Sequence, residues 1–541
     1  MLILRTMLEP RYWAFSAAIL VALLTTAALL LVPQYHVLTV PIWLLSCVLA
    51  LVGLYDVTQK RHAILRNYPI VANMRFVLES IRPELRQYFF EGEKDGAPFP
   101  RDKRAIVYQR AKKELDKRPF GTMYDVYAPQ FEWLHHSIAP KPPAALADLR
   151  VSVGTGPRAY SASLLNISAM SYGALSGNAI RALNQGARDG GFFHDTGEGG
   201  VSPYHREFGG DLVWELGSGY FGARDASGRF DSDRFAEAAS DAQIKMIEVK
   251  LSQGAKPGHG GVLPASKVTA EIAAIRGVPI GVDCVSPAHH AEFSTPIELL
   301  QFIAKLRDLS GGKPTGFKLC IGHRWEFMAI CKAMLATQIT PDFIVIDGKE
   351  GGTGAAPLEF MDHMGMPLRD GLSFAHNALR GVGLRGQVRL GASGKITSAF
   401  DMARVMAMGA DWCNSARGFM FAVGCIQAQS CHTGTCPTGV ATQDPARARA
   451  IDVPSKADRV TSYHRNTLIA LSELVAAAGL SHPSELRGHH FLTRLAGDRV
   501  VSLDQKFPPL AEGELLIAGE TVTTFSAAFA EARAESFARH I

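Results

Sequence analysis

Short apolar runs alternate with longer amphipathic runs over residues 163–415, and this alternation constrains the fold more than any other feature of the chain. The apolar runs have strand lengths, and the segments between them have helical periodicity. The expected strands are residues 164–169, 192–195, 246–250, 278–285, 316–320, 343–347, 388–391 and 412–415. Eight such units in about 250 residues predict an α/β fold, a (β/α)8 TIM barrel, in which chemistry sits at the carboxyl ends of the strands.

Two apolar runs precede this region, at residues 14–32 and 37–55, and each is long enough to cross a bilayer. Neither has a polar stripe, which favours a transmembrane hairpin over a buried helical hairpin. A signal peptide is the other alternative, but no clear cleavage site follows the first run. Basic residues flank the pair: Arg5 and Arg11 before it, and Lys60, Arg61, His62 and Arg66 after it. The positive-inside rule therefore predicts a two-span membrane protein with both ends and the catalytic domain in the cytoplasm.

The expected organisation has four parts. These are a transmembrane hairpin (1–62), a helical linker region (63–150), the barrel (151–424) and a cysteine-bearing loop with a helical C-terminal extension (425–541). A chain of 541 residues with 47% hydrophobic content can bury a large core. Its net charge is only +5, and its 56 basic residues form no long run, so nucleic-acid binding is not expected.

Three cysteines, Cys425, Cys431 and Cys436, follow the last expected strand with the spacing C-x5-C-x4-C. Three thiolates without a fourth at similar spacing favour a [3Fe-4S] cluster over a four-cysteine cubane. A zinc site completed by His432 or Cys413 is one alternative. Free thiols in a reducing compartment are another.

Glycine-containing turns follow the last two expected strands, where such barrels commonly bind phosphate. Ser393, Gly394 and Lys395 follow the seventh strand, and Arg417 and Gly418 follow the eighth. Glycine permits close backbone approach and the cations add positive charge. Either tripeptide alone is typical of a plain turn, but the two together predict the phosphate site of a flavin.

The cysteine loop belongs to a larger set of ordered motifs. They are Cys425-Ile426, Cys431-His432, Cys436-Pro437 and residues 439–443 in the loop, with the runs 196–200, 253–258, 347–348 and 351–355 before it. Together they resemble the FMN-binding synthase domain of glutamate synthase over about residues 160–490, specifically its short, stand-alone, membrane-anchored relatives.

This resemblance implies roles for residues at the strand ends. Ala169, Met170 and Ser171 are expected to lie against the flavin ring of FMN. Lys250, which ends the third expected strand, and Gln253 are expected on the N1/O2 side of the ring, where a cation stabilises reduced flavin.

The substrate residues are expected to be Lys318, Glu198 and Asp347. The resemblance assigns Lys318 to the carboxylates of 2-oxoglutarate, and a salt bridge from Lys318 to Glu198 or Asp347 is an equally good interpretation. His259 stands where the family has glutamate, and residues 321–324 also depart from its pattern, so the substrate itself stays open.

The resemblance further implies reduction of a 2-imino acid, formed from a 2-oxo acid and ammonia or an amine, with FMN and an iron–sulfur cluster as cofactors. A membrane anchor stands where full-length synthases carry a glutaminase domain, so glutamine hydrolysis is not expected. No G-x-G-x-x-G follows a strand. Electrons are therefore expected from ferredoxin, a flavoprotein or a membrane carrier.

Two other functions remain open at this stage. One is an FMN oxidoreductase on the same scaffold that acts on a different oxo or amino acid or exchanges electrons with a membrane carrier. The other is a non-enzymatic redox sensor.

Overall fold

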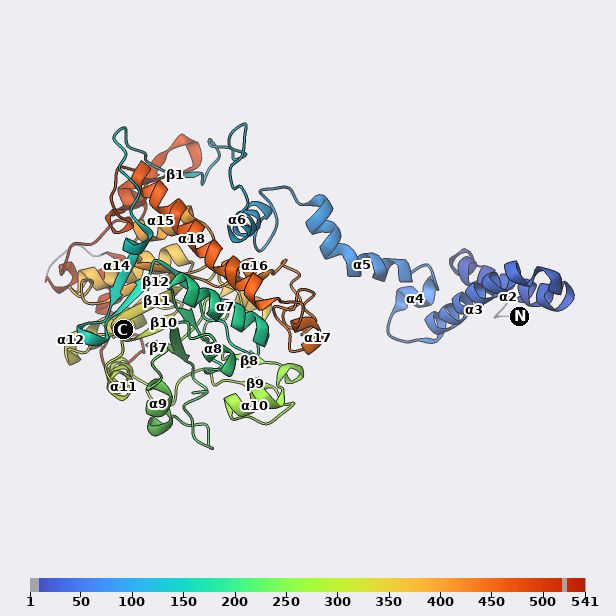
Figure 1. The fold of residues 1–541 in the computed structure, drawn as a ribbon, viewed down its shortest axis with the longest axis horizontal. Coiled ribbons are helices and arrows are strands. Elements are labelled where there is room, and N and C mark those ends of the chain that lie inside the picture. Colours follow the sequence, from blue (N-terminus) through green and yellow to red (C-terminus); the bar gives the residue numbers. More distant parts are fainter. Residues whose placement is uncertain (1–8, 518–522, 541) are drawn as a thin grey trace. The chain divides into compact units, whose positions relative to one another are not determined.

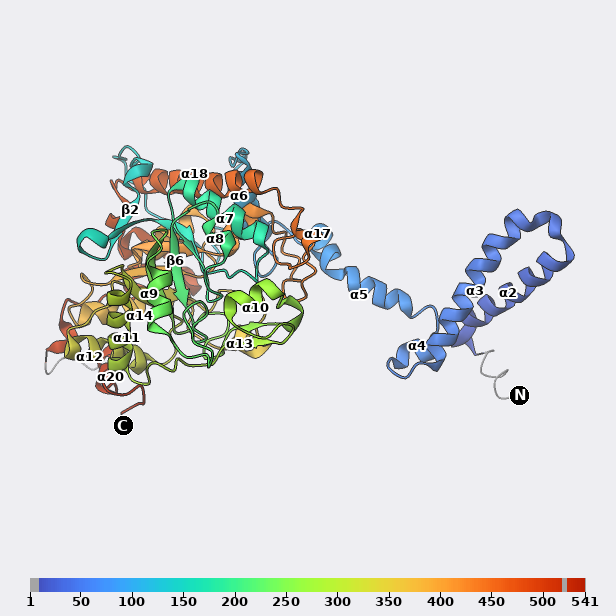
Figure 2. The same ribbon diagram turned by 60° about the horizontal axis from the view of Figure 1, so that its bottom comes forward.

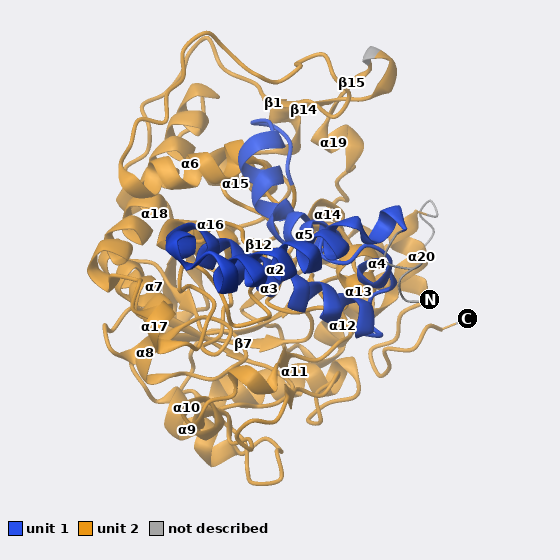
Figure 3. Cartoon of the chain, turned by 90° about the vertical axis from the view of Figure 1, so that its right-hand side faces the viewer, with its two compact units in different colours: residues 1–96 blue, residues 97–541 orange. Residues whose placement is uncertain are grey.

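The computed structural model describes residues 9–517 and 523–540, so Arg5 lies outside the described residues. The chain divides into two compact units, residues 1–96 and residues 97–541 (Figure 3).

The first unit contains a hairpin of two long helices, α2 (Trp13–Leu31) and α3 (His36–Thr58), which lie side by side (Figure 2). With the short turns before them they form two apolar stretches, Pro10–Leu31 and Pro33–Thr58, each only 11% buried over its most apolar window. By length and composition both are candidate membrane spans, criteria that a signal sequence or a core helix also meets. Two shorter helices follow, α4 (Ala63–Asn67) and α5 (Asn73–Leu85).

The second unit is built on a closed barrel of eight parallel strands, which confirms the predicted (β/α)8 fold (Figure 1). The strands pair in chain order: β4 (Leu165–Ile167), β5 (His194–Asp195), β6 (Leu212–Leu216), β7 (Ile244–Lys250), β10 (Thr315–Leu319), β11 (Phe343–Asp347), β12 (Arg389–Ser393) and β13 (Trp412–Ser415). The helices that follow them are α7 (Gly177–Gly190), α8 (Pro203–Arg206), α9 (Ser232–Ala239), α11 (Pro296–Leu309), α12 (Arg324–Thr337), α14 (Leu368–Gly381), α15 (Ala399–Ala407) and α16 (Arg417–Val423).

One of the eight expected strands is wrong. Residues 278–285 lie outside the barrel, where the side chains of Ile280 and Val282 are 65% and 53% exposed. Only Cys284–Val285 is a strand, β9, and it pairs with β8 (Val262–Leu263) in a two-stranded sheet. The apolar run belongs to an excursion between β7 and β10 that also holds α10 (Ala270–Arg276).

The strand that sequence reasoning missed is β6, which is buried along its whole length. β6 contains Glu215, which interrupts its apolar pattern. The helix before it, α8, has only four residues, so the alternation of strands and long helices is also weak there. Lys250 consequently ends the fourth barrel strand rather than the third.

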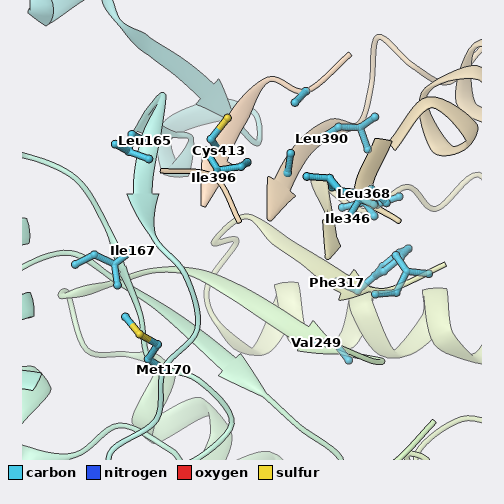
Figure 4. Close-up of a cluster of buried hydrophobic side chains, with 14 of the residues drawn as sticks. Leu165, Ile167, Met170, Val249, Phe317, Ile346, Leu368, Leu390, Ile396 and Cys413 are labelled. Carbon is cyan, nitrogen blue, oxygen red and sulfur yellow. The ribbon is translucent and has the colours of Figure 1, made fainter. Parts of the chain in front are cut away.

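Alternation along the strands separates two cores. Ile247 and Val249 on β7 belong to the core between the barrel and its helices, and Figure 4 shows Val249 in this core. Met246 on the same strand points the other way, into a second cluster inside the barrel. That inner cluster joins side chains near the amino ends of the strands to a hairpin formed by β2 (Arg150–Val153) and β3 (Tyr160–Ser163). Its members are Val153, Tyr160, Ala162, Phe193, Val213, Met246, Phe343, Val345 and Trp412. We call it the barrel floor, because it fills the amino end of the barrel with apolar side chains.

The long C-terminal helix α18 (Val453–Ala477) lies along α7 and α6 (Arg101–Lys112) (Figures 1 and 2). The approach to α7 is close, since a Cβ at Gly186 would lie 2.5 Å from Val460 Cγ1. On α6, the Tyr108 hydroxyl donates a hydrogen bond to the Cys425 carbonyl oxygen at 2.6 Å. The helical extensions thus support the barrel and the start of the cysteine loop.

Candidate functional site

A cleft with about 1080 Å³ of empty space opens at the carboxyl ends of the barrel strands, and we call it the main cleft. Every residue expected to contact cofactor or substrate lines it, together with one of the three cysteines. They are Ala169, Met170, Ser171, Glu198, Lys250, Gln253, Lys318, Asp347, Ser393, Gly394, Lys395, Arg417, Gly418 and Cys431. The barrel therefore brings together residues spread over more than 260 positions of sequence.

One end of the main cleft has the features of a phosphate site. The Ser393 hydroxyl, at the end of β12, lies 3.3 Å from the Ser168 hydroxyl after β4. Gly394 and Lys395 turn the chain away with φ of 152° and 50°. Positive φ at both residues closes a tight turn beside Lys395 and Arg417, which suits a phosphate group.

Arg417 connects this end of the cleft to two other loops. Its guanidinium donates to the Thr353 carbonyl oxygen at 3.0 Å and approaches Cys431 Sγ at 3.9 Å. The glycine-rich run 351–354 lines the same wall. A flat ring fits beside such small residues and backbone groups, so the donor set of the main cleft fits FMN.

At the other end of the main cleft, Lys250 forms an ion pair with Glu198, with Nζ and Oε1 3.0 Å apart. Burial alone would raise the pKa of Glu198, but Lys250, Arg276 and Lys256 outweigh this effect and hold the pKa below its usual value. Glu198 is therefore a carboxylate at neutral pH. The Gly261 backbone packs closely against it, because a Cβ at Gly261 would lie 2.1 Å from Oε1.

Asp347 fixes the loop that carries Gln253. One of its carboxylate oxygens accepts a hydrogen bond from the Gly254 backbone N–H at 2.7 Å. A Cβ at Gly254 would lie 1.8 Å from the Gly348 carbonyl oxygen, so only glycine fits there. Asp347 is thus a structural link between the loops after β7 and β11.

Lys318 does not form the salt bridge to Glu198 or Asp347 that we considered from the sequence. Its ammonium contacts Glu215 and lies 3.3 Å from Glu248, two carboxylates that sequence reasoning did not select. A glutamate at an inward position of a buried strand was the available signal for both.

Of the three cysteines, only Cys431 lines the main cleft. Burial raises the pKa of Cys425, and Cys431 and Cys436 raise it further, so the three lie near one another. Cys425 and Cys436 are buried and Cys431 is partly exposed. A tetrahedral zinc ion with Zn–S bonds of about 2.3 Å places its sulfur ligands about 3.8 Å apart. In the described part of the chain, the cysteine sulfurs form no group of three ligand atoms within 4.8 Å of one another. A cluster of several iron atoms accepts more widely separated thiolates than a single zinc ion does.

A smaller cleft adjoins the main cleft and shares six lining residues with it: Ser171, Ala174, Glu198, Thr353, Gly354 and Cys431. We call it the basic branch, because its wall includes three buried cations: Lys256, Lys267 and Arg276. Lys267 donates to the Cys431 carbonyl oxygen at 2.6 Å, and Arg276 donates to the Tyr172 carbonyl oxygen at 3.1 Å. Sequence reasoning did not select these cations, since they come from loops and a short helix outside the strand ends.

The charges of the basic branch do not balance. No hydrogen bond or ion pair links the Lys256 ammonium to another described residue, although Lys256 is only 2% exposed. The Arg276 Nε atom is buried and also lacks a partner within the described residues. Burial lowers the pKa of Lys256, and Glu198 opposes this effect. The branch therefore has unpaired donors and an excess of positive charge for an anionic ligand.

The departures from the family pattern lie elsewhere. His259 packs edge-on against Phe360, with ring centroids 5.3 Å apart. His323 stacks on Trp325 at 4.0 Å. Neither histidine is among the described residues that line the two clefts.

The chain is similar to several known proteins. Residues 153–481 match a family model described as the conserved region in glutamate synthase. The glutamate synthase large subunit-like protein YerD of Bacillus subtilis is 37% identical over 490 residues, which cover 83% of this chain and 93% of YerD. An archaeal NADPH glutamate synthase of Methanocaldococcus jannaschii is 36% identical over 341 residues, covering 63% of this chain but only 62% of that protein. Among solved structures, a mandelate oxidase mutant with a monooxide FMN adduct is 15% identical, with a TM-score of 0.39, and covers 78% of this chain and 100% of that one. The barrel is established by its strand pairing.

Proposed function

Because the chain belongs to the glutamate synthase family, we propose that it is an FMN-dependent oxidoreductase that converts a 2-oxo acid and ammonia into an amino acid. 2-Oxoglutarate is the first candidate substrate, and glutamate is its product. The proposal rests on the chemistry of the two connected clefts.

The observation that carries the proposal is the excess positive charge of the basic branch. The buried Arg276 Nε atom lacks a partner within the described residues. Lys256 and Arg276 both act on Glu198, where the branch meets the main cleft. A dicarboxylate is a ligand that pairs with several cations at once. Bound in the branch, it would present its oxo carbon toward the main cleft.

The residues of the main cleft would hold FMN. Lys395, Arg417 and the turn at Gly394 would bind the phosphate, and Ser171 and Met170 would lie along the ring. Bound FMN would supply hydride chemistry to the substrate. Lys250 and Gln253 would place positive charge and a hydrogen-bonding amide beside the ring.

Cys425, Cys431 and Cys436 would hold an iron–sulfur cluster, with [3Fe-4S] the first candidate. Arg417 supports this arrangement, because its guanidinium contacts both the Thr353 loop and the Cys431 sulfur. Electrons would arrive from an external donor, which is a ferredoxin, a flavoprotein or a membrane carrier.

Other residues would orient and protect the reaction. Glu198 stays ionised between Lys250 and Lys256 and would hold an ammonium ion or the amino group of the product near the oxo carbon. The two apolar helices would anchor residues 1–62 in a membrane, the region 63–150 would connect them to the barrel, and the catalytic domain would lie in the cytoplasm.

The test is an anaerobic half-reaction. The detergent-purified protein is reduced, 2-oxoglutarate and ammonium are added singly and together, and the flavin absorbance is followed. Reoxidation that needs both compounds and yields glutamate would support the proposal. Reoxidation by another oxo acid or by a quinone would assign a different substrate on the same scaffold, and a flavin that ignores every acceptor would favour a redox sensor.

A further inference from the structure

Four ionisable side chains meet inside the barrel, between the barrel floor and the main cleft. They are Asp195 on β5, Glu215 on β6, Glu248 on β7 and Lys318 on β10, and none is more than 4% exposed. One carboxylate oxygen from each acid lies within 4.8 Å of the others. The Lys318 ammonium contacts Glu215 and lies 3.3 Å from Glu248. We call this group the interior cluster.

The interior cluster borders the main cleft on one side and the barrel floor on the other. Below it, the barrel floor fills the amino end of the barrel with apolar side chains. Above it, Glu215 and Lys318 line the main cleft, whereas Asp195 and Glu248 do not. Asp195 and Glu248 therefore lie behind a contacting acid–base pair that faces the cleft.

The charges of this group cannot all be present at neutral pH. Three carboxylates against one ammonium would bury two uncompensated negative charges, a costly arrangement that protonation relieves. Burial, reinforced by Glu215, raises the pKa of Asp195 to about 7, against the opposing effects of Lys318, the Gly197 N–H and Glu248. Burial also raises the pKa of Glu248. Burial alone would lower the pKa of Lys318, but Glu215, Glu248, Asp195 and Asp347 outweigh it, so the ammonium keeps its proton.

The proposed reaction consumes protons. Ammonia first adds to the oxo carbon of the 2-oxo acid, which gives a carbinolamine. Its C–O bond must then break: the hydroxyl takes a proton and leaves as water, and the nitrogen lone pair forms the C=N bond of the iminium ion. Hydride addition then gives the amine, which takes up another proton. The sum is 2-oxo acid, ammonium, two electrons and two protons giving amino acid and water, with the electrons supplied by the external donor. Glu198 is a poor source for these protons, since neighbouring cations hold it ionised.

We propose that the interior cluster is a proton-delivery site for the main cleft, in which Asp195 and Glu248 hold the proton and the Glu215–Lys318 pair passes it to the leaving hydroxyl of the carbinolamine. This inference rests on the proposed function. Lys318 is an ammonium in the resting protein and transfers a proton only as the leaving hydroxyl gains hydroxide character. Asp195 or Glu248 then replaces that proton, so Lys318 is an ammonium again before the next turnover. Asp195 and Glu248 are positioning residues in this scheme, because they act through Lys318 without touching substrate.

The first arm of the test uses the resting protein and needs no turnover. Infrared spectroscopy in H2O and D2O should detect a buried protonated carboxyl whose absorption declines as pH rises through about 7, the pKa of Asp195. The Asp195→Asn variant should lose this absorption. The Glu79→Gln variant is the matched control, because Glu79 is an exposed carboxylate in the first unit. A native protein with no protonated carboxyl below that pH would overturn the proposal.

The second arm follows turnover. The kcat of the native enzyme should fall as pH rises above about 7, because Asp195 then loses the proton that it would supply. Asp195→Asn and Glu248→Gln should lower kcat about 100-fold, a typical contribution of general acid catalysis, with little change in KM and a larger solvent deuterium isotope effect. Folded variants with native kcat and an unchanged pH profile would overturn the proposal.

The two arms separate this inference from the proposed function. If Asp195→Asn does not fold, Glu248→Gln and the native infrared titration still decide the outcome. If glutamate forms but the variants behave as the native enzyme does, proton delivery fails and the proposed function stands. If no oxo acid is consumed, the proposed function fails and this delivery role fails with it, while the infrared arm separately shows whether the cluster holds a proton.

Discussion

The Lys250 ammonium lies 3.0 Å from the Glu198 carboxylate, although Lys250 ends β7 and Glu198 belongs to the loop after β5. Their side chains are only 10% and 18% exposed, so the pair is largely shielded from solvent screening. The contact joins two strand ends at the place where the main cleft meets the basic branch. Each partner compensates the charge of the other.

Replacing Lys250 should therefore be more harmful alone than together with its partner. Lys250→Met leaves the Glu198 carboxylate without its nearest cation, and we expect the free energy of unfolding to fall by about 1–3 kcal/mol. Adding Glu198→Gln should recover part of that loss, because the amide carries no charge. Urea unfolding of the two single variants and the double variant measures the coupling. Losses that simply add would show that the pair contributes nothing.

Lys256 and Arg276 should control substrate affinity rather than the chemical step. A charge-assisted hydrogen bond contributes about 1.5–3 kcal/mol, so Lys256→Met and Arg276→Gln should each raise the KM for the oxo acid about tenfold to a hundredfold. Steady-state kinetics at saturating ammonium measures this effect. Lys305→Met is the control, since Lys305 is 45% exposed and pairs with Glu292 outside both clefts. An unchanged KM in both cleft variants would remove the basic branch from substrate binding.

The cysteine loop should be separable from the flavin site. Cys431→Ser is expected to abolish the EPR signal of the cluster and lower the iron content, with FMN still bound, because serine is a poor ligand for iron in such clusters. Cys47→Ser is the matched control, as Cys47 lies on α3 in the first unit. Native iron content in Cys431→Ser would contradict the ligand assignment.

Gly254 should not tolerate any side chain. A Cβ there would lie 1.8 Å from the Gly348 carbonyl oxygen, so Gly254→Ala must separate the loops that Asp347 joins. We expect a loss of about 1–3 kcal/mol in stability, as for other overpacked sites, together with weaker FMN binding. Gly322→Ala, which meets no atom within 4 Å, should behave as the native protein does. Thermal unfolding and flavin content compare the two variants.

Buried histidines should make the second unit sensitive to acid. Burial lowers the pKa of His205, His376 and His464 to about 3 and that of His290 to about 4. Unfolded histidines titrate near about 6.5, so the folded state binds fewer protons between about pH 6.5 and about pH 3. Stability is therefore complete above about pH 6.5 and falls as pH decreases through this window. Denaturant unfolding across the window measures the slope, and His464→Gln should reduce it by one proton.

The barrel could be predicted from the sequence because seven of its strands are short apolar runs followed by helices. The eighth could not, since β6 contains a glutamate and follows a helix of only four residues. Residues 278–285 were mistaken for a strand because local apolar content does not reveal that Ile280 faces solvent. An apolar run indicates a strand only where its side chains are buried. In the excursion after β7, Ile280 and Val282 are exposed.

The residues of the main cleft could be predicted from the expected strand ends, because a barrel brings the carboxyl ends of its strands together whatever the conformation of the loops. The basic branch was missed because Lys256, Lys267 and Arg276 come together only through the irregular excursion after β7. The partners of Lys318 were missed for another reason. Glu215 and Glu248 meet it through the register of β6, β7 and β10, which hydrogen-bond pairing fixes and sequence does not display.

The barrel floor fills the amino end of the barrel with apolar side chains, so the carboxyl ends of the strands form its open end. The substrates and products of the proposed reaction would accordingly enter and leave at the carboxyl ends of the strands. The amino acid product of the proposed enzyme should therefore inhibit competitively against the oxo acid, because both would occupy the same opening. Electrons would not have to pass through that opening, because the proposed cluster ligand Cys431 lies in the wall of the main cleft.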